Sequence, residues 1–148
     1  MQHLHAYFEK LYACYNHRRF VIPDPLQFLY DYDDLQDREI VALIAATLAY
    51  GRVAQILKSV AAVLDRLGPS PAAFLRHSSP QRIRKAVSGL KHRFTSEKEI
   101  GSLLVAVKHV IAVEGSLYRC FRSGIQPEDG TILPALDLFV QRLAGSAG

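Results

Sequence analysis

The chain has 148 residues, of which 49% are hydrophobic and 22% are charged, a composition typical of one soluble globular domain. A domain of this size can bury a core without disulfides or a structural metal, and the two cysteines, Cys14 and Cys120, belong to no metal-binding pattern. The formal net charge is +4, no apolar run is long enough to span a membrane, and the N-terminus lacks a signal-peptide pattern, so we expect a cytoplasmic protein without a cofactor.

The first half of the chain predicts three helices. Apolar residues recur at helical spacing over about 3–15, whereas residues 17–34 contain two prolines and predict irregular or single-turn structure whose aromatic side chains pack on the core. Asp37 is expected to cap a helix that runs to about Tyr50 and is apolar on all sides, which makes it the buried central helix. After Gly51, the apolar spacing predicts a strongly amphipathic helix that ends before Gly68.

The second half predicts helices that begin with local capping signals. Ser70 and Ser79 each precede a proline, as is typical of an N-cap followed by the first helical residue. Ser96 and Glu99 form a capping box ahead of a long helix that Gly115 ends. The expected helices are 71–76, 80–90, about 97–114, a short one from Ser116, and a last one over about 132–143.

No segment alternates with a period of two residues for long enough to predict a strand, and the chain has no internal repeat. The predicted fold class is therefore all-α, with about seven to eight helices in a single compact domain over residues 1–148.

Positive charge is concentrated between Arg76 and His109. Eight basic and two acidic residues give this segment a net charge of +6, so the rest of the chain carries −2. Such a separation is typical of a face that binds a polyanion, although basic residues on a short helix can also form only its solvated side. The candidate basic face comprises Arg82, Arg84, Lys85, Lys91 and Arg93.

A second candidate site is the turn Tyr50-Gly51-Arg52, which joins the two helices of the first half. Glycine permits a tight turn, tyrosine can stack on a base, and arginine can contact a phosphate or a base edge at the start of a helix. The alternative is that Tyr50 packs inward and that Arg52 pairs with a carboxylate such as Asp24 or Asp37.

Other catalytic and metal-binding patterns find little support. The six histidines are scattered, form no metal-binding pair on a predicted helix, and are interpreted as surface or loop residues. The acidic residues between Asp31 and Glu39 lack the glycine and the glutamate of a calcium loop, and helix-start carboxylates explain them better. We predict no metal site, and a metal-dependent hydrolase that uses these carboxylates remains a third hypothesis.

Several short motifs resemble an uncharacterised bacterial family that is known only as a conserved domain of unknown function. The most specific of them is the string Leu48-Ala49-Tyr50-Gly51-Arg52-Val53, and others are Asp24-Pro25-Leu26, Arg93-Phe94 and Gly115-Ser116-Leu117. The resemblance covers nearly the whole chain. Because members of that family are longer, it implies that this chain is an N-terminal portion or a shortened member.

The order of the predicted helices is also remotely similar to the helical barrel of the helix-hairpin-helix DNA glycosylase superfamily. In those enzymes, the turn that corresponds to Tyr50-Gly51-Arg52 faces DNA, so the resemblance implies a DNA-facing role for these residues. The hairpin motif and the catalytic lysine or aspartate of that superfamily have no counterpart in this sequence. Catalytic residues are therefore unassigned, and base excision is the reaction that the resemblance suggests if the family is enzymatic.

Two functions of different classes follow. The first is a DNA-binding helical domain, with structured RNA as an alternative ligand and no membrane partner. The second is an interaction or oligomerisation scaffold, in which the last helix pairs with another copy or with a C-terminal partner. The apolar stripe behind the second hypothesis comprises Ile132, Leu133, Leu136, Phe139, Val140 and Leu143.

Overall fold

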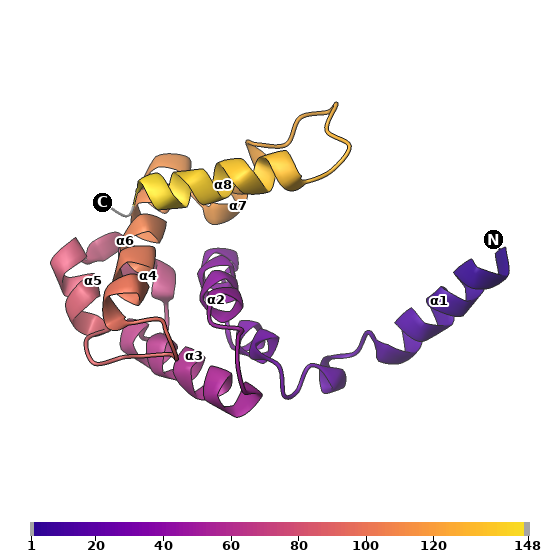
Figure 1. Cartoon of the computed structure of the whole chain (residues 1–148), viewed down its shortest axis with the longest axis horizontal. Coiled ribbons are helices and arrows are strands. Elements are labelled where there is room, and N and C mark those ends of the chain that lie inside the picture. Colours follow the sequence, from indigo (N-terminus) through magenta and orange to yellow (C-terminus); the bar gives the residue numbers. More distant parts are fainter. Residues whose placement is uncertain (1, 147–148) are drawn as a thin grey trace.

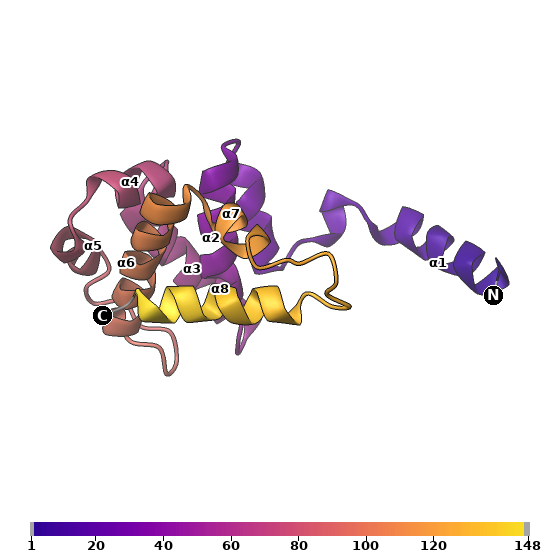
Figure 2. The ribbon, with the colours of Figure 1, turned by 90° about the horizontal axis from the view of Figure 1, so that it is seen from above.

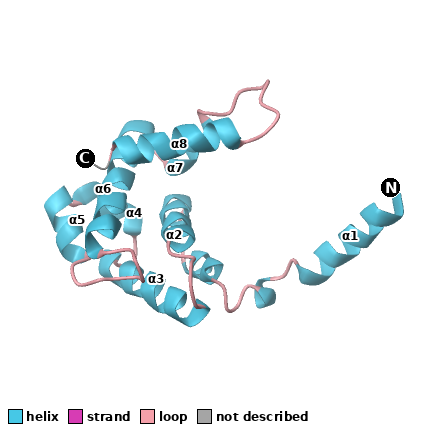
Figure 3. Cartoon of the chain, in the orientation of Figure 1, coloured by secondary structure: helices cyan, strands magenta, loops and turns pink. Residues whose placement is uncertain are grey.

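The computed structural model describes residues 2–146 and confirms the all-α fold class (Figure 3). This range contains no strand, and none of its helices has both the length and the apolar character needed to cross a membrane. The elements in chain order are α1 (Gln2–Tyr15), the 3₁₀ helices η1 (Arg18–Phe20) and η2 (Pro25–Asp31), α2 (Leu35–Thr47), α3 (Val53–Leu67), α4 (Pro71–His77), α5 (Pro80–Ala86), α6 (Glu97–Glu114), α7 (Leu117–Arg122) and α8 (Leu133–Gly145).

Helix α6 lies at the centre of the helical body, where it packs against α4, α5, α7 and α8 (Figure 1). Four consecutive residues, 104–107, are buried, so α6 is covered on all sides at this level. The prediction that the helix before Gly51 is the fully buried one is therefore wrong. Helix α2 contributes Ile40, Val41 and Ile44 to the core but leaves Ala46 and Thr47 exposed.

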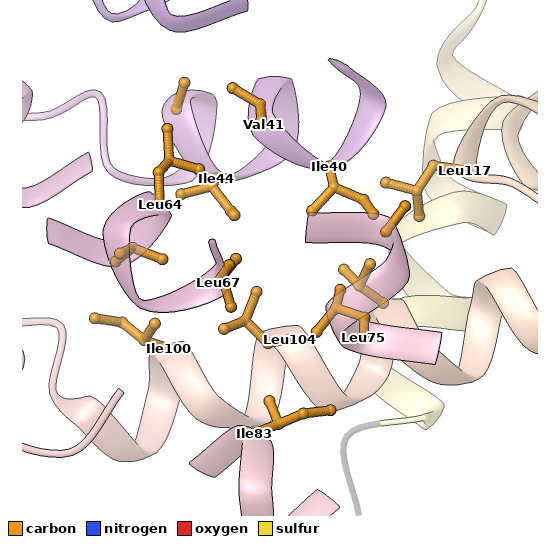
Figure 4. Close-up of a cluster of buried hydrophobic side chains, with 14 of the residues drawn as sticks. Ile40, Val41, Ile44, Leu64, Leu67, Leu75, Ile83, Ile100, Leu104 and Leu117 are labelled. Atoms are coloured by element: carbon orange, nitrogen blue, oxygen red, sulfur yellow. The ribbon is translucent and has the colours of Figure 1, made fainter. Parts of the chain in front are cut away.

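One hydrophobic cluster joins the helices from α2 to α7 (Figure 4). The close-up shows Ile40 and Ile44 of α2 facing Leu67 of α3 and Leu104 of α6, with Ile83 of α5 on the other side of α6. Each fully buried leucine or isoleucine contributes about 1.5–3 kcal/mol relative to an exposed one. The cluster thus fixes the ends of α2 and α3, between which the Tyr50-Gly51-Arg52 turn lies.

Most helix boundaries agree with the prediction because local caps define them. Ser70 and Ser79 accept hydrogen bonds from the backbone amides of Ala73 and Arg82, and each is followed by proline. Helix α5 ends at Ala86 rather than near Leu90. The backbone bonds after Ala86 instead close short turns, and these turns lead into the loop that precedes α6.

Asp37 is buried and does not cap α2 as predicted. Asp34 is the N-cap, since its carboxylate accepts hydrogen bonds from the amides of Gln36 and Asp37. The carboxylate of Asp37 instead accepts bonds from the Ala72 amide at 2.7 Å and from the Ser70 hydroxyl at 3.1 Å. The Asp37 carboxylate, which belongs to α2, therefore accepts hydrogen bonds from donors at the N-terminus of α4.

The other acidic residues of this region also satisfy backbone amides. Asp24 caps η2 through the Leu26 amide at 2.8 Å, and Glu39 accepts from the Tyr118 amide in the first turn of α7 at 3.0 Å. These contacts support the interpretation of the acidic residues as helix-start carboxylates.

The N-terminal segment lies outside the helical body. Helix α1 extends away from it (Figure 2), and its predicted apolar stripe is exposed except for the half-buried Leu11. The expectation that the aromatic residues of 17–34 pack on the core holds for Phe28 and Tyr32. It is wrong for Phe20 and Tyr30, whose rings are exposed, with the Arg18 guanidinium 4.4 Å from the Tyr30 ring centre.

Replacing Asp37 with alanine is expected to lower the free energy of unfolding by about 2–3 kcal/mol, because two donors at the start of α4 lose a charged acceptor. Urea denaturation measures the change. Asp65→Asn, at an exposed position on α3, serves as the control and should have little effect. Equal stabilities of the two variants would contradict the role assigned to Asp37.

Candidate nucleic-acid interface

The turn between α2 and α3 depends on Gly51. This residue has a φ of +108°, a conformation that side-chain-bearing residues rarely adopt. Arg52 follows in an extended conformation as the N-cap of α3, and its side chain is exposed and forms no capping hydrogen bond. The turn therefore presents a free guanidinium beside the start of a 15-residue helix.

Tyr50 points towards a second loop, at residues 91–96, and not freely into solvent. Its hydroxyl donates to the His92 carbonyl at 2.9 Å and lies 2.7 Å from the Thr95 hydroxyl. Its ring packs edge-on against the His92 ring, with 4.7 Å between the ring centres. This geometry corresponds to the inward-packing alternative for Tyr50.

His92 is a loop residue, as the interpretation of the histidines as surface or loop residues allows, but it is fully buried at 0% exposure. Its Nε2 atom lies 3.0 Å from the Tyr50 carbonyl oxygen, and its Nδ1 atom lies 2.9 Å from the Ser59 hydroxyl on α3. Because a carbonyl only accepts, Nε2 carries a proton, and in the neutral ring Nδ1 accepts from Ser59. The imidazole thus joins the loop, the turn and α3.

The loop itself is a tight reversal with Arg93 and Phe94 at its tip. Mutual backbone hydrogen bonds of 2.8 and 2.9 Å between His92 and Thr95 close it. Arg93 adopts a left-handed φ of +51°, and Phe94 is 83% exposed. Exposing a phenylalanine ring to water at the tip of a hydrogen-bonded turn is energetically unfavourable. An aromatic residue in such a position is typical of a binding site.

The chain after the loop enters α6 through the predicted capping box. The Glu99 carboxylate accepts from the Ser96 amide at 2.7 Å and from the Ser96 hydroxyl at 2.9 Å. These bonds, the backbone one above all, hold the pKa of Glu99 below its usual value because they favour the charged form. The loop is therefore fixed at its C-terminal end by α6 and in its middle by Tyr50.

Docking of the loop brings Arg93 directly over the turn. A Cβ atom placed on Gly51 would lie 2.7 Å from Cδ and 2.9 Å from Nη1 of Arg93, so a side chain at this position would displace the Arg93 side chain. The Arg93 guanidinium also lies 5.6 Å from the centre of the Phe94 ring. We call the exposed group Gly51, Arg52, Arg93 and Phe94 the turn–loop surface.

The structure thus joins some predicted site residues and separates others. Gly51 and Arg93 are in contact, Arg52 is adjacent in the chain, and Tyr50 supports them from below. Lys91 lies next to His92 at the base of the same loop.

The three basic residues of α5 lie apart from the turn–loop surface. Arg82 stacks on Phe74 of α4 at 5.7 Å, and Arg84 packs against Gly101 of α6. Lys85 is exposed. Figures 1 and 2 both place α5 at the outer edge of the body, away from the turn that precedes α3.

Two residues of this region were not predicted as functional. Phe94 is an apolar residue inside a basic segment for which no regular structure is predicted. This unusual placement is the sequence feature that could have identified it. Lys58 lies on the polar face of α3 near Lys91, and no local pattern distinguishes it from other solvated lysines.

A family model matches most of the chain. The model of the family described as "Protein of unknown function (DUF2400)" matches residues 24–147. No curated protein and no solved structure matches the chain.

Replacing Tyr50 with phenylalanine should loosen the loop without altering any charge. The variant loses the bonds to His92 and Thr95, so we expect a stability loss of about 1–2 kcal/mol and faster hydrogen exchange at the Thr95 amide. Tyr12→Phe, on the exposed face of α1, is the matched control. Unchanged exchange at Thr95 would show that Tyr50 does not hold the loop.

Proposed function

We propose that this chain, which belongs to the DUF2400 family, binds nucleic acid through the turn–loop surface. The observation that carries the proposal is that the hydrogen bonds between Tyr50 and His92 hold the loop against the turn, so that Arg93 lies over Gly51, the residue that precedes Arg52. Two guanidinium groups next to exposed backbone match the phosphates of a nucleic-acid strand.

The charge of this surface supports an anionic ligand. Within residues 2–146, the ion pairs are Arg38–Asp33 and Arg142–Glu114, so neither Arg52 nor Arg93 has a carboxylate partner there. Asp37, one of the partners considered for Arg52, is engaged at the start of α4. Both guanidinium groups are therefore available to phosphate.

The exposed Phe94 ring supports a ligand with accessible bases. An aromatic ring at a loop tip can stack on an unpaired base or enter a base step, which would add about 1–3 kcal/mol per stacked base. We propose damaged or distorted duplex DNA rather than structured RNA as the ligand, because the sequence predicts an order of helices like that of DNA glycosylases. Arginine, glycine and phenylalanine supply neither a nucleophile nor a general base, so the proposal is limited to binding.

Removing either guanidinium from the turn–loop surface should weaken binding to duplex DNA. Arg52→Ala and Arg93→Ala are each expected to weaken binding about tenfold, and each should reduce the slope of log K against log salt by about 0.9 for one lost phosphate contact. Fluorescence anisotropy with intact, abasic-site and single-stranded DNA at several salt concentrations measures both quantities.

Two further variants show whether the effect is local. Arg122→Ala, on the exposed side of α7, removes the same charge elsewhere and should leave binding nearly unchanged. The triple variant of Arg82, Arg84 and Lys85 to alanine tests whether the α5 residues also contact the strand. Binding that does not depend on salt, or equal affinities for Arg52→Ala, Arg93→Ala and wild type, would refute the proposal.

The second candidate, a scaffold function, is favoured by the surface of α8. Leu133, Leu136 and Val140 are exposed, whereas Phe139 and Leu143 pack against the core and Arg142 pairs with Glu114 of α6 at 2.7 Å. The apolar stripe of the last helix is thus divided between the core and solvent. Self-association in light scattering without affinity for nucleic acid would favour this function.

A further inference from the structure

A depression of about 260 Å³ lies between α3 and the segment 89–92 that leads into the loop. One wall is formed by Gln55, Lys58 and Ser59 of α3, and the other includes Lys91. Buried side chains, among them Val63, His92 and Ile100, close its base.

The depression carries two positive charges and no negative one among the residues that line it. Lys58 and Lys91 are exposed, and neither takes part in the two ion pairs found in residues 2–146. The Glu97 carboxylate contacts the lining, because it accepts from the Gly89 amide, and it also accepts from the Ser88 hydroxyl. Glu97 is not among the residues that line the depression, and the ion pairs of the described residues join it to neither lysine.

The neutral polar groups of the wall add a further hydrogen-bond donor. The Ser59 hydroxyl lies 2.9 Å from Nδ1 of His92 and accepts from Nε2 of Gln55 at 3.3 Å. The amide nitrogen of Gln55 has two hydrogens, and only one is used in this bond. The lining therefore offers two ammonium groups and an amide N–H, which is a donor set suited to an anion.

From these features we infer that the depression is a binding site for a phosphate monoester. A monoester carries between one and a half and two negative charges at neutral pH, which matches two unpaired lysines better than the single charge of a phosphodiester does. Because the depression is closed at its bottom, it suits a terminal phosphate group better than a phosphodiester within a continuous strand.

The site adjoins the turn–loop surface. Gln55 and Ser59 are four residues apart and share one face of α3, and Arg52, the N-cap of this helix, lies three residues before Gln55. Lys91 and Arg93 belong to the same loop on the opposite side. A nucleic-acid strand bound by Arg52 and Arg93 could therefore place its terminal phosphate in the depression. This assignment of the ligand to a strand end rests on the proposed function, whereas the anion site itself does not.

The first experiment titrates the ¹⁵N-labelled protein with inorganic phosphate at constant ionic strength, with sodium chloride as the reference. We expect saturable amide shifts at residues 55–59 and 89–92, which Lys58→Ala and Lys91→Ala abolish and Lys10→Ala, an exposed lysine of α1, preserves. Shifts that do not saturate, or that persist in both pocket variants, would overturn the inference.

The second experiment distinguishes a strand end from a free phosphate compound as the source of the monoester. If the ligand is a strand end, an oligonucleotide with a 5′- or 3′-phosphate should bind at least fivefold tighter than its hydroxyl-ended counterpart, and the ratio should fall to one in the Lys58→Ala/Lys91→Ala variant. Equal affinities overturn the strand-end source. If neither oligonucleotide binds but inorganic phosphate does, the proposed function fails and the anion site stands.

Discussion

The hydrogen bonds between Tyr50 and His92 hold together two loops whose anchoring residues are 42 positions apart in the chain. Each residue bonds to the backbone of the other, through the Tyr50 hydroxyl in one direction and the His92 Nε2 atom in the other. Tyr50 is half-buried and His92 is fully buried, so water competes little for the hydrogen bonds between them. Arg93 and Phe94 of the turn–loop surface depend on this docking for their position over the turn.

The hydrophobic core gives this pair a rigid support. Leu48 at the end of α2 and Ile56 near the start of α3 are buried on either side of the turn, and Ile100 is buried in the first turn of α6 just after the loop. The three helix ends are thus fixed by the same cluster that Figure 4 shows. Short loops between fixed helix ends can hold charged side chains in place at a small entropic cost.

Features encoded by neighbouring residues could be predicted, and features made by distant contacts could not. The caps at Ser70, Ser79 and Ser96 require only a few consecutive residues, and all three lie where the sequence places them. The roles of Asp37 and His92 depend on partners 35 and 42 positions away, and nothing in the local sequence marks these residues as buried. For the same reason, the sequence shows that Arg52 and Arg93 are basic but not that Arg93 lies over Gly51, the residue that precedes Arg52.

The measurement that tests the central claim most directly is an amide chemical-shift map of the protein with an abasic-site duplex. The account predicts that the largest shifts fall together on Gly51, Arg52 and Val53 of the turn and on Lys91, Arg93 and Phe94 of the loop, while α7 and α8 remain unaffected. Shifts confined to α5, or to the exposed stripe of α8, or no shifts at low salt, would show that the docked turn and loop do not form the nucleic-acid interface.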